Sequence, residues 1–243
     1  DLFHDTEKAV ADAYAKDIQI LKDNDFAAET LISQPGFIRA RIQDSNDTLL
    51  IDWAQDSIWR FLEPVPLENL GWVLHPVDLA VNKVHALAGR DEARDFLDTI
   101  FLHERVLPLG ALIWAAAGKD PGLNPRMLLG LLQRKGLVTT EELERLDLSA
   151  DINLPELHDT WKRALKDAKL WIDQRPPDEA GCLYTDPETG RLIAPIGDQP
   201  AEILRGAPGG VLPSIHGVPA RSFTESAVLQ STIEAFFHQK ISK

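Results

Sequence analysis

Apolar residues recur every three or four positions near the start of the chain, between Glu7 and about Lys22. This spacing is typical of an amphipathic helix, and Asp5 or Thr6 can supply the side-chain oxygen that caps it. The apolar stripe consists of Val10, Ala13, Tyr14, Ile18 and Leu21. The preceding residues, "DLFHD", predict the end of a strand that leads into this helix.

Three short runs that favour β-strands follow, at 28–33 ("AETLIS"), 37–43 ("FIRARIQ") and 48–54 ("TLLIDWA"). They are bounded by turn-forming residues, as strands usually are. The polar segment "DSND" joins the second run to the third. These two strands are therefore expected to form a hairpin.

The strand expected at 37–43 has two different faces, because successive side chains of a strand point to opposite sides. One face holds Ile38, Ala40 and Ile42, and the other holds Phe37, Arg39, Arg41 and Gln43. In the next strand Asp52 lies between Ile51 and Trp53, where an unpaired carboxylate would be costly to bury. Asp52 therefore needs a partner side chain, a metal ion or water.

The chain becomes helical from Val77 onward. One helix is predicted to about Ala88, with Gly89 as its break, and a second from a cap at Asp91 to about Glu104. Further helices are expected at 109–118, 125–136, 139–146 and 155–174.

Two of these later helices carry additional signals. Thr139 and Glu142 form a capping box at the start of one of them. The helix at 155–174 has an apolar stripe that consists of Leu157, Trp161, Leu165, Ala168 and Ile172.

The composition changes after the segment 174–181, "QRPPDEAG". The segment 181–195, "GCLYTDPETGRLIAP", predicts a hairpin that turns between Asp186 and Gly190. The Gly- and Pro-rich segment 205–219 is expected to be a loop, and 225–239 a closing helix.

The order of these elements predicts an α+β fold with three regions. Residues 1–75 are expected to form a mixed β-sheet with helices, 76–175 a helical region, and 176–243 a small β-containing tail.

Composition narrows the possible function classes. The net charge of −13 disfavours a broad nucleic-acid-binding face, although it permits a local basic groove. Cys182 is the single cysteine, which excludes an intrachain disulfide and a cysteine-based zinc site. With no apolar run of about 18 residues, we expect a cytoplasmic protein without a membrane anchor. Because Met127 is the only methionine, we also expect residues to precede Asp1.

The stretch 78–98, "DLAVNKVHALAGRDEARDFLD", combines an apolar helical pattern with many charges. The charges that two helices would bring together are Lys83, Arg90, Arg94, Asp95 and Asp98. Periodicity alone favours an ion-pair network between the helices. Phosphoryl transfer is the functional alternative, since Asp side chains hold Mg²⁺ while Lys or Arg neutralises phosphates. Asp52 would complete such a site.

Four segments in this order resemble motifs of the nucleotidyltransferase-fold toxins of the abortive-infection AbiEii/AbiGii type. They are "DLFHD", "LLIDWA", "DLAVNKVHALAGR" and "RDFLD". That family has a Gly-Gly-Ser helix start before an Asp-x-Asp strand, then a Lys-x-x-Ala-x-x-x-Arg-like helix and an Arg-Asp-x-x-Asp segment. The Gly-Gly-Ser element and the first Asp are absent from this chain. The resemblance spans roughly residues 1–105 and implies a nucleotidyltransferase-type mixed sheet.

The resemblance assigns roles to individual residues. Asp1 is similar to the second Asp of the Asp-x-Asp motif, and Asp52 lies where the fold usually has its third carboxylate. The lysine motif is matched, with slightly different spacing, by Lys83, Ala86 and Arg90, and the last motif by Arg94, Asp95 and Asp98. The catalytic residues that follow from this resemblance are Asp1, Asp52, Lys83, Asp95 and Asp98.

The activity implied by the resemblance is in-line attack by an acceptor hydroxyl on the α-phosphate of a nucleoside triphosphate (NTP), with pyrophosphate leaving. Asp1, Asp52 and the absent first Asp would hold Mg²⁺ as the cofactor. The residues implied in nucleotide binding are Lys83, Arg90, Arg94, Arg39 and Arg41. For the two strand arginines, a solvated sheet face is the alternative.

The implied partners are the NTP, an RNA acceptor such as tRNA or a protein acceptor, and a cognate antitoxin in a bacterial toxin–antitoxin or abortive-infection context. A non-catalytic nucleotide-binding or regulatory protein is one alternative. The other is an interaction module in which Lys83, Arg94, Asp95 and Asp98 pair only with one another. The histidines lack metal-ligand spacing and the serines lack a Gly-x-Ser-x-Gly motif, so neither a zinc site nor a hydrolase triad is expected.

Overall fold

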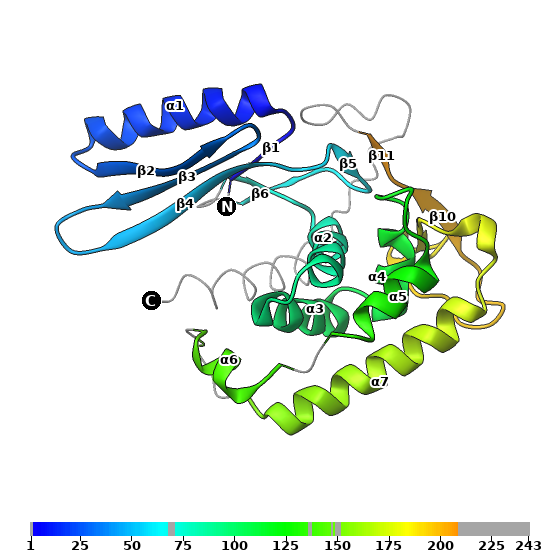
Figure 1. The fold of residues 1–243 in the computed structure, drawn as a ribbon. Helices are drawn as coiled ribbons and strands as arrows, with labels where there is room; N and C mark the ends of the chain where they lie inside the picture. Colours follow the sequence, from blue (N-terminus) through cyan, green and yellow to red (C-terminus); the bar gives the residue numbers. More distant parts are fainter. Residues whose placement is uncertain (1, 68–70, 136–137, 147, 149–151, 209–243) are drawn as a thin grey trace. The chain divides into compact units, whose positions relative to one another are not determined.

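The computed structural model describes residues 2–67, 71–135, 138–146, 148 and 152–208. These residues form an α+β fold, which confirms the predicted fold class. By their contacts they divide into two compact units (Figure 1). The first unit consists of residues 2–59 with Pro208, and the second unit of residues 60–207.

The first unit is a mixed β-sheet with one long helix. Its elements are β1 (Leu2–His4), α1 (Glu7–Asp23), β2 (Ala27–Gln34), β3 (Phe37–Gln43) and β4 (Thr48–Gln55). The described strands are ordered β1-β4-β3-β2. Strand β1 runs parallel to β4, whereas β2, β3 and β4 form an antiparallel meander. The predicted helix, its preceding strand and the hairpin of the last two strands are all confirmed.

Local polar contacts set the ends of these elements. Of the two caps predicted for α1, Thr6 is used: its hydroxyl accepts a hydrogen bond from the Ala9 N–H at 3.0 Å. Gly36 has a φ of +73° in the turn between β2 and β3, where a side chain would be strained. Asp44 accepts hydrogen bonds from the N–H groups of Asn46 and Asp47, both at 2.7 Å, and so closes the predicted β3–β4 turn.

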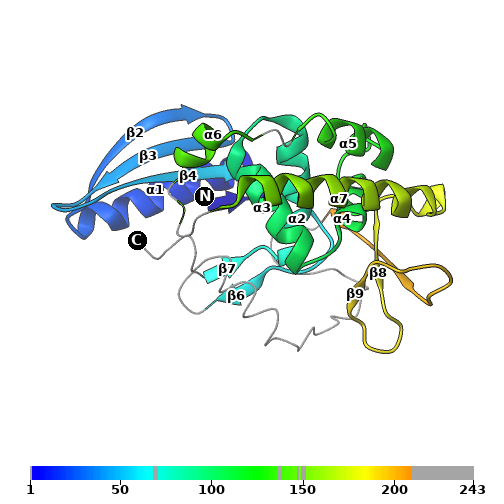
Figure 2. The same cartoon turned by 90° about the horizontal axis from the view of Figure 1, so that it is seen from below.

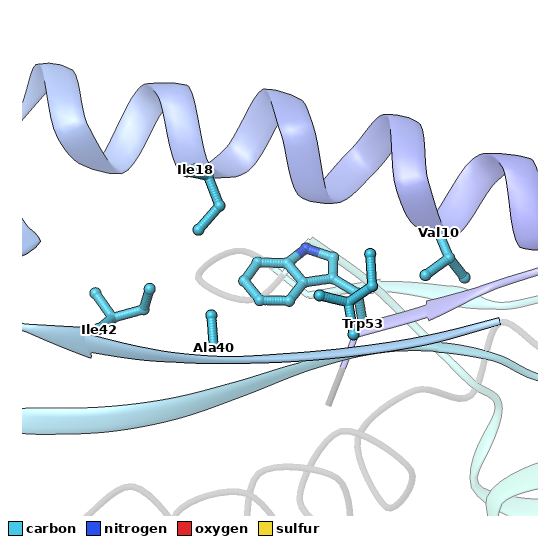
Figure 3. Packing of buried hydrophobic residues seen from close by; sticks show 6 residues of the cluster. Val10, Ile18, Ala40, Ile42 and Trp53 are labelled. Carbon is cyan, nitrogen blue, oxygen red and sulfur yellow. The ribbon is translucent and has the colours of Figure 1, made fainter. Parts of the chain in front are cut away.

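Helix α1 covers one face of the sheet, and the core of the first unit lies between them (Figure 3). The buried residues of this core are Val10, Ile18, Ile38, Ala40, Ile42 and Trp53. The predicted apolar face of β3 is therefore confirmed. The Trp53 ring meets Tyr14 edge-to-face at 5.1 Å, and its indole N–H donates to Asp17 at 2.8 Å, so the largest core residue has a polar partner.

The second unit contains most of the helices. They are α2 (Pro76–Gly89), α3 (Ala93–Arg105), α4 (Leu109–Ala116), α5 (Pro125–Leu132), α6 (Thr140–Glu144), α7 (Leu154–Asp173) and the short 3₁₀ helix η1 (Pro177–Glu179). Its strands are β6 (Val65–Leu67), β7 (Gly71–Val73), β8 (Cys182–Thr185), β9 (Leu192–Ile193) and β10 (Glu202–Arg205). Strands β5 (Trp59–Arg60) and β11 (Ala207–Pro208) pair with each other.

Helix α4 is the centre of the second unit, because all of its residues are buried. Helix α7 packs along it and along α3 (Figure 2). A side chain at Gly110 of α4 would meet the Ala168 backbone of α7 at 3.1 Å, so two small residues permit this close approach. Trp161, Ala168 and Ile172 of the predicted stripe are buried, and Leu157 and Leu165 are half-buried.

Several predicted details agree with the structure and others do not. The capping box of Thr139 and Glu142 forms, and the hairpin of β8 and β9 turns where predicted. The predicted Asp91 cap is wrong: Glu92 is the N-cap residue of α3 and makes no side-chain capping bond, whereas Asp91 binds Lys135 at 2.6 Å. Strands β6, β7 and β10 were not predicted.

The break between the two units falls at Trp59. The segment that follows is tied to the second unit, since the N–H groups of Phe61 and Leu62 bond to Asp78 of α2. The helix expected at 225–239 and most of the loop expected at 205–219 lie outside the described residues. Within the described part of the chain, no helix is long and apolar enough to cross a membrane.

Candidate functional site

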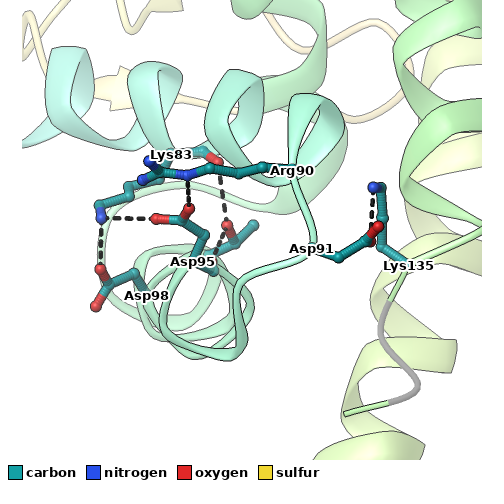
Figure 4. Close-up of polar contacts among 7 residues, drawn as sticks. Lys83, Arg90, Asp91, Asp95, Asp98 and Lys135 are labelled. Atoms are coloured by element: carbon teal, nitrogen blue, oxygen red, sulfur yellow. Dashed lines mark hydrogen bonds and ion pairs between the residues drawn. The ribbon is translucent and has the colours of Figure 1, made fainter. Parts of the chain in front are cut away.

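The structure gathers the predicted site residues into separate groups. Arg39, Arg41 and Asp52 lie on neighbouring strands of the first unit. Lys83, Arg90, Asp95 and Asp98 lie together on α2 and α3 of the second unit (Figure 4). Asp1 lies outside the described residues.

Arg39 and Asp52 form the first group, here called the sheet pair. They are direct partners in the antiparallel register of β3 and β4, on the face opposite α1. The Arg39 Nε and Nη2 atoms donate to the two carboxylate oxygens of Asp52 at 2.6 and 2.7 Å. This two-pronged geometry is the strong form of an Arg–carboxylate contact. The hydrogen bonds from Arg39 hold the pKa of Asp52 below its ordinary value. The partner that Asp52 was predicted to need is therefore Arg39.

Arg41 has a similar partner on the other side of β3. Its Nη1 donates to Glu29 Oε2 of β2 at 2.6 Å, and the two residues are opposite each other in the register. Both side chains are much more exposed than Asp52. The polar face of the sheet thus carries two arginines, each with a carboxylate on a flanking strand.

The second group, here called the helix network, consists of Lys83, Arg90, Asp95 and Asp98. Lys83 and Arg90 are seven residues apart, about two helical turns, and Arg90 is the C-cap of α2. Asp95 and Asp98 are three residues apart and therefore share one face of α3. The Lys83 ammonium lies 2.9 Å from Asp95 Oδ1 and 2.7 Å from Asp98 Oδ2, and Arg90 Nε lies 2.6 Å from Asp95 Oδ2.

Asp95 is the centre of the helix network because it contacts both cations. Its side chain is only 1% exposed. Burial alone would raise its pKa, but the hydrogen bonds from Arg90 and Lys83 outweigh burial and hold the pKa below its ordinary value. Asp95 therefore stays ionised, and its charge is compensated inside the protein.

Arg94 does not join this arrangement. Its side chain is exposed on α3. Among the described residues no ion pair links it to Asp98, the i,i+4 partner expected from the sequence, since Asp98 is directed to Lys83 instead.

Two buried titratable residues at the start of α2 were not assigned a role from the sequence. Asp78 accepts the N–H groups of Phe61 at 2.8 Å and Leu62 at 3.0 Å, and burial raises its pKa to about 6. His75 caps α2 by accepting the Val77 N–H at 3.3 Å, and burial lowers its pKa to about 4. The sequence signal was "HPVD", in which proline marks the first helical turn and polar residues flank it.

The fit of Mg²⁺, the expected cofactor, can be tested against these contacts. Within the described ranges, no three His, Cys, Asp or Glu side chains gather closely enough to hold a metal ion. Both oxygens of Asp52 accept from Arg39, and Asp95 is bound by two cations. The described residues by themselves therefore do not fit a magnesium ion.

Comparison of the chain with protein-family models, curated proteins and solved structures finds no match. The resemblance to the AbiEii type therefore stays a prediction based on motifs.

Proposed function

We propose that this chain is a nucleotidyltransferase that moves a nucleotide from an NTP to an acceptor hydroxyl. One observation carries the proposal. In the mixed sheet Leu2 of β1 pairs in parallel with Trp53 of β4, and these residues directly follow Asp1 and Asp52 in the sequence. The resemblance requires two neighbouring strands with carboxylates, and the described part of this sheet supplies Asp52 on β4, directly beside β1.

The reaction is a substitution at the α-phosphorus. The acceptor oxygen forms a bond to this phosphorus, the bond from it to the bridging oxygen of the β-phosphate breaks, and pyrophosphate leaves. The proton of the hydroxyl passes to solvent. Positioning and charge stabilisation dominate the catalysis of such transfers.

The chain's own cations suit this chemistry. Arg39 and Arg41 lie on the sheet face that carries Asp52, and guanidinium groups bind phosphate in a two-pronged manner. Lys83 belongs to the second unit and is bound by Asp95 and Asp98, so its role in nucleotide binding rests on the resemblance. An RNA such as tRNA, or a protein, is the proposed acceptor. Mg²⁺ as cofactor, an antitoxin partner and a toxin-like role rest on the resemblance alone.

The test measures transfer of label by the full chain. Each α-labelled NTP is incubated in turn with Mg²⁺ and with total cell RNA or protein. We expect label in one acceptor class with the unmodified protein, and none with Asp52→Asn. The matched control is Asp12→Asn, because Asp12 lies on the exposed side of α1 and should not affect transfer. Equal transfer by Asp52→Asn, or no transfer from any NTP, would contradict the proposal.

A second candidate is the non-catalytic interaction or nucleotide-binding module. The observation in its favour is that Asp52 and Lys83 already have oppositely charged partners within the protein. Lys83→Gln tests this candidate. In an interaction module Lys83 is structural, so the variant loses thermal stability. Neither the variant nor the unmodified protein then transfers a nucleotide, and weaker NTP binding by a folded Lys83→Gln variant would contradict this candidate.

A further inference from the structure

The two arginines of β3 have partners that differ in how they are held. Asp52 is 14% exposed and binds Arg39 through both of its oxygens, whereas Glu29 is 64% exposed and binds Arg41 through one. Arg39 itself is 38% exposed. An anion from solution can therefore reach the Arg39 guanidinium while Asp52 holds it from within the sheet.

Phosphate and carboxylate both bind a guanidinium through paired N–H donors, and Asp52 occupies the Nε and Nη2 donors of Arg39. A triphosphate carries more negative charge than one carboxylate and offers the same two-pronged acceptor geometry. The Arg39 guanidinium also lies 5.6 Å from the centre of the Phe37 ring, a cation–π contact that does not depend on Asp52. This contact can keep Arg39 in position after its carboxylate partner is lost.

We infer that Arg39 is a binding residue for the triphosphate of a nucleotide and that Asp52 competes with this triphosphate for it. This inference rests on the proposed function for the identity of the ligand. Triphosphate binding exchanges one partner of Arg39 for another and releases the Asp52 carboxylate. Asp52 and Arg39 thus compensate each other's charge until the nucleotide arrives.

Asp52→Asn should therefore abolish nucleotide transfer but strengthen the binding of triphosphate. Removing the carboxylate should tighten triphosphate binding, because the competing anion is gone. The experiment is calorimetric titration of the full chain with inorganic triphosphate and, separately, with ATP, in EDTA at low ionic strength where charge effects are least screened. Asp52→Asn should bind both ligands about tenfold more tightly than the unmodified protein, a change of ~1.4 kcal/mol.

Variants of the arginines test whether the gain depends on Arg39. Arg39→Gln should bind triphosphate more weakly than the unmodified protein, and the double variant Arg39→Gln/Asp52→Asn should lose the gain of Asp52→Asn. Arg39→Lys should show an intermediate affinity, because it keeps the positive charge but loses the two-pronged geometry of the guanidinium. Thermal melts confirm that each variant is folded, and Asp52→Ser replaces Asp52→Asn if the amide disrupts the sheet.

The matched control uses the second pair on the same strand. Glu29→Gln removes the same charge as Asp52→Asn, so a general effect of net charge would raise affinity equally in both. We expect at most a twofold gain for Glu29→Gln. An equal gain in both variants, or no gain in Asp52→Asn, overturns the inference. Because this titration needs neither metal nor acceptor, tighter binding without any nucleotide transfer would refute only the proposed function.

Discussion

The sheet pair and the helix network contain the same chemical groups but differ in burial and connectivity. In the sheet pair one arginine serves one carboxylate that solvent can partly reach. In the helix network one carboxylate that is almost fully buried serves two cations, and Lys83 is shared with Asp98. A single exchangeable partner suits a site that binds a ligand. A shared buried charge suits the packing of two helices.

The comparison changes the interpretation of the charged stretch at 78–98. Lys83, Arg90, Asp95 and Asp98 are arranged as the ion-pair network that periodicity alone favoured, whereas Arg94 is not part of it. Each partner compensates a charge that would be costly in isolation. The sheet pair is the better candidate for ligand chemistry because an incoming anion can replace its carboxylate. Mutations in the two groups should separate a role in helix packing from a role in ligand binding.

Loss of Asp95 should have the largest effect on stability. Asp95→Asn leaves Lys83 and Arg90 without their shared carboxylate, and breaking a buried ion pair in this way costs about 3–5 kcal/mol. Urea unfolding followed by circular dichroism measures the change. The control is Asp91→Asn, which removes the exposed carboxylate bound to Lys135 and should cost less than about 1 kcal/mol. Similar losses in the two variants would show that Asp95 is no more structural than a surface charge.

A third carboxylate, bonded to backbone N–H groups, provides the contrast to Asp95 and Asp52, which side-chain cations bind. Asp78 is bonded to backbone N–H groups, and its pKa is raised to about 6, whereas the pKa of His75 one turn away is lowered to about 4. Since the folded pKa of Asp78 is raised, its contribution to stability is present below about pH 4 and is lost as the pH rises to about 6. The contribution of His75 is present above about pH 6.5 and is lost as the pH falls to about 4.

The two contributions therefore oppose each other between about pH 4 and 6.5, each on the order of 3 kcal/mol. Relative to the unmodified protein, Asp78→Asn should lose stability as the pH falls through this window, and His75→Gln should gain it. Urea unfolding at several pH values between 4 and 7 gives the slope of the free energy of unfolding against pH for the unmodified protein and for each of the two variants. All other titrating groups are common to the three proteins. Parallel slopes would therefore contradict the raised pKa of Asp78 and the lowered pKa of His75.

The sequence predicted the elements whose signal is local. Helix α1 and strands β2 to β4 follow from periodicity and from caps within a few residues, and so does the apolar face of β3. Strands β6, β7 and β10 are short, and their hydrogen bonds come from strand pairing that a local pattern does not encode. The predicted Asp91 cap is wrong because the Asp91 carboxylate binds Lys135, which is distant in the sequence.

In the candidate site, too, local features could be predicted from the sequence, whereas contacts between distant residues could not. That Asp52 needs a partner could be predicted from its apolar neighbours, but the choice of Arg39 over a metal ion or water depends on the register of β3 and β4. Asp95 and Asp98 could be grouped because their helical spacing puts them on one face of α3, whereas their contact with Lys83 depends on how α2 and α3 pack. Asp78 was missed because its hydrogen-bond donors are the backbone N–H groups of Phe61 and Leu62, which no side-chain pattern reveals.

The smallest expected effect compares the two strand pairs directly. Double-mutant cycles with Arg39→Gln and Asp52→Asn, and with Arg41→Gln and Glu29→Gln, give the coupling free energy of each pair from urea unfolding. We expect about 1–2 kcal/mol for the first, whose carboxylate is mostly buried, and about 0.2–1 kcal/mol for the second, which solvent screens. Raising the salt concentration to about 1 M should remove most of the second coupling and less of the first, because screening acts on exposed charges. If the Arg39–Asp52 and Arg41–Glu29 coupling free energies are equal and depend equally on salt, the two arginines are interchangeable. Arg39 would then be no better a candidate for triphosphate binding than Arg41.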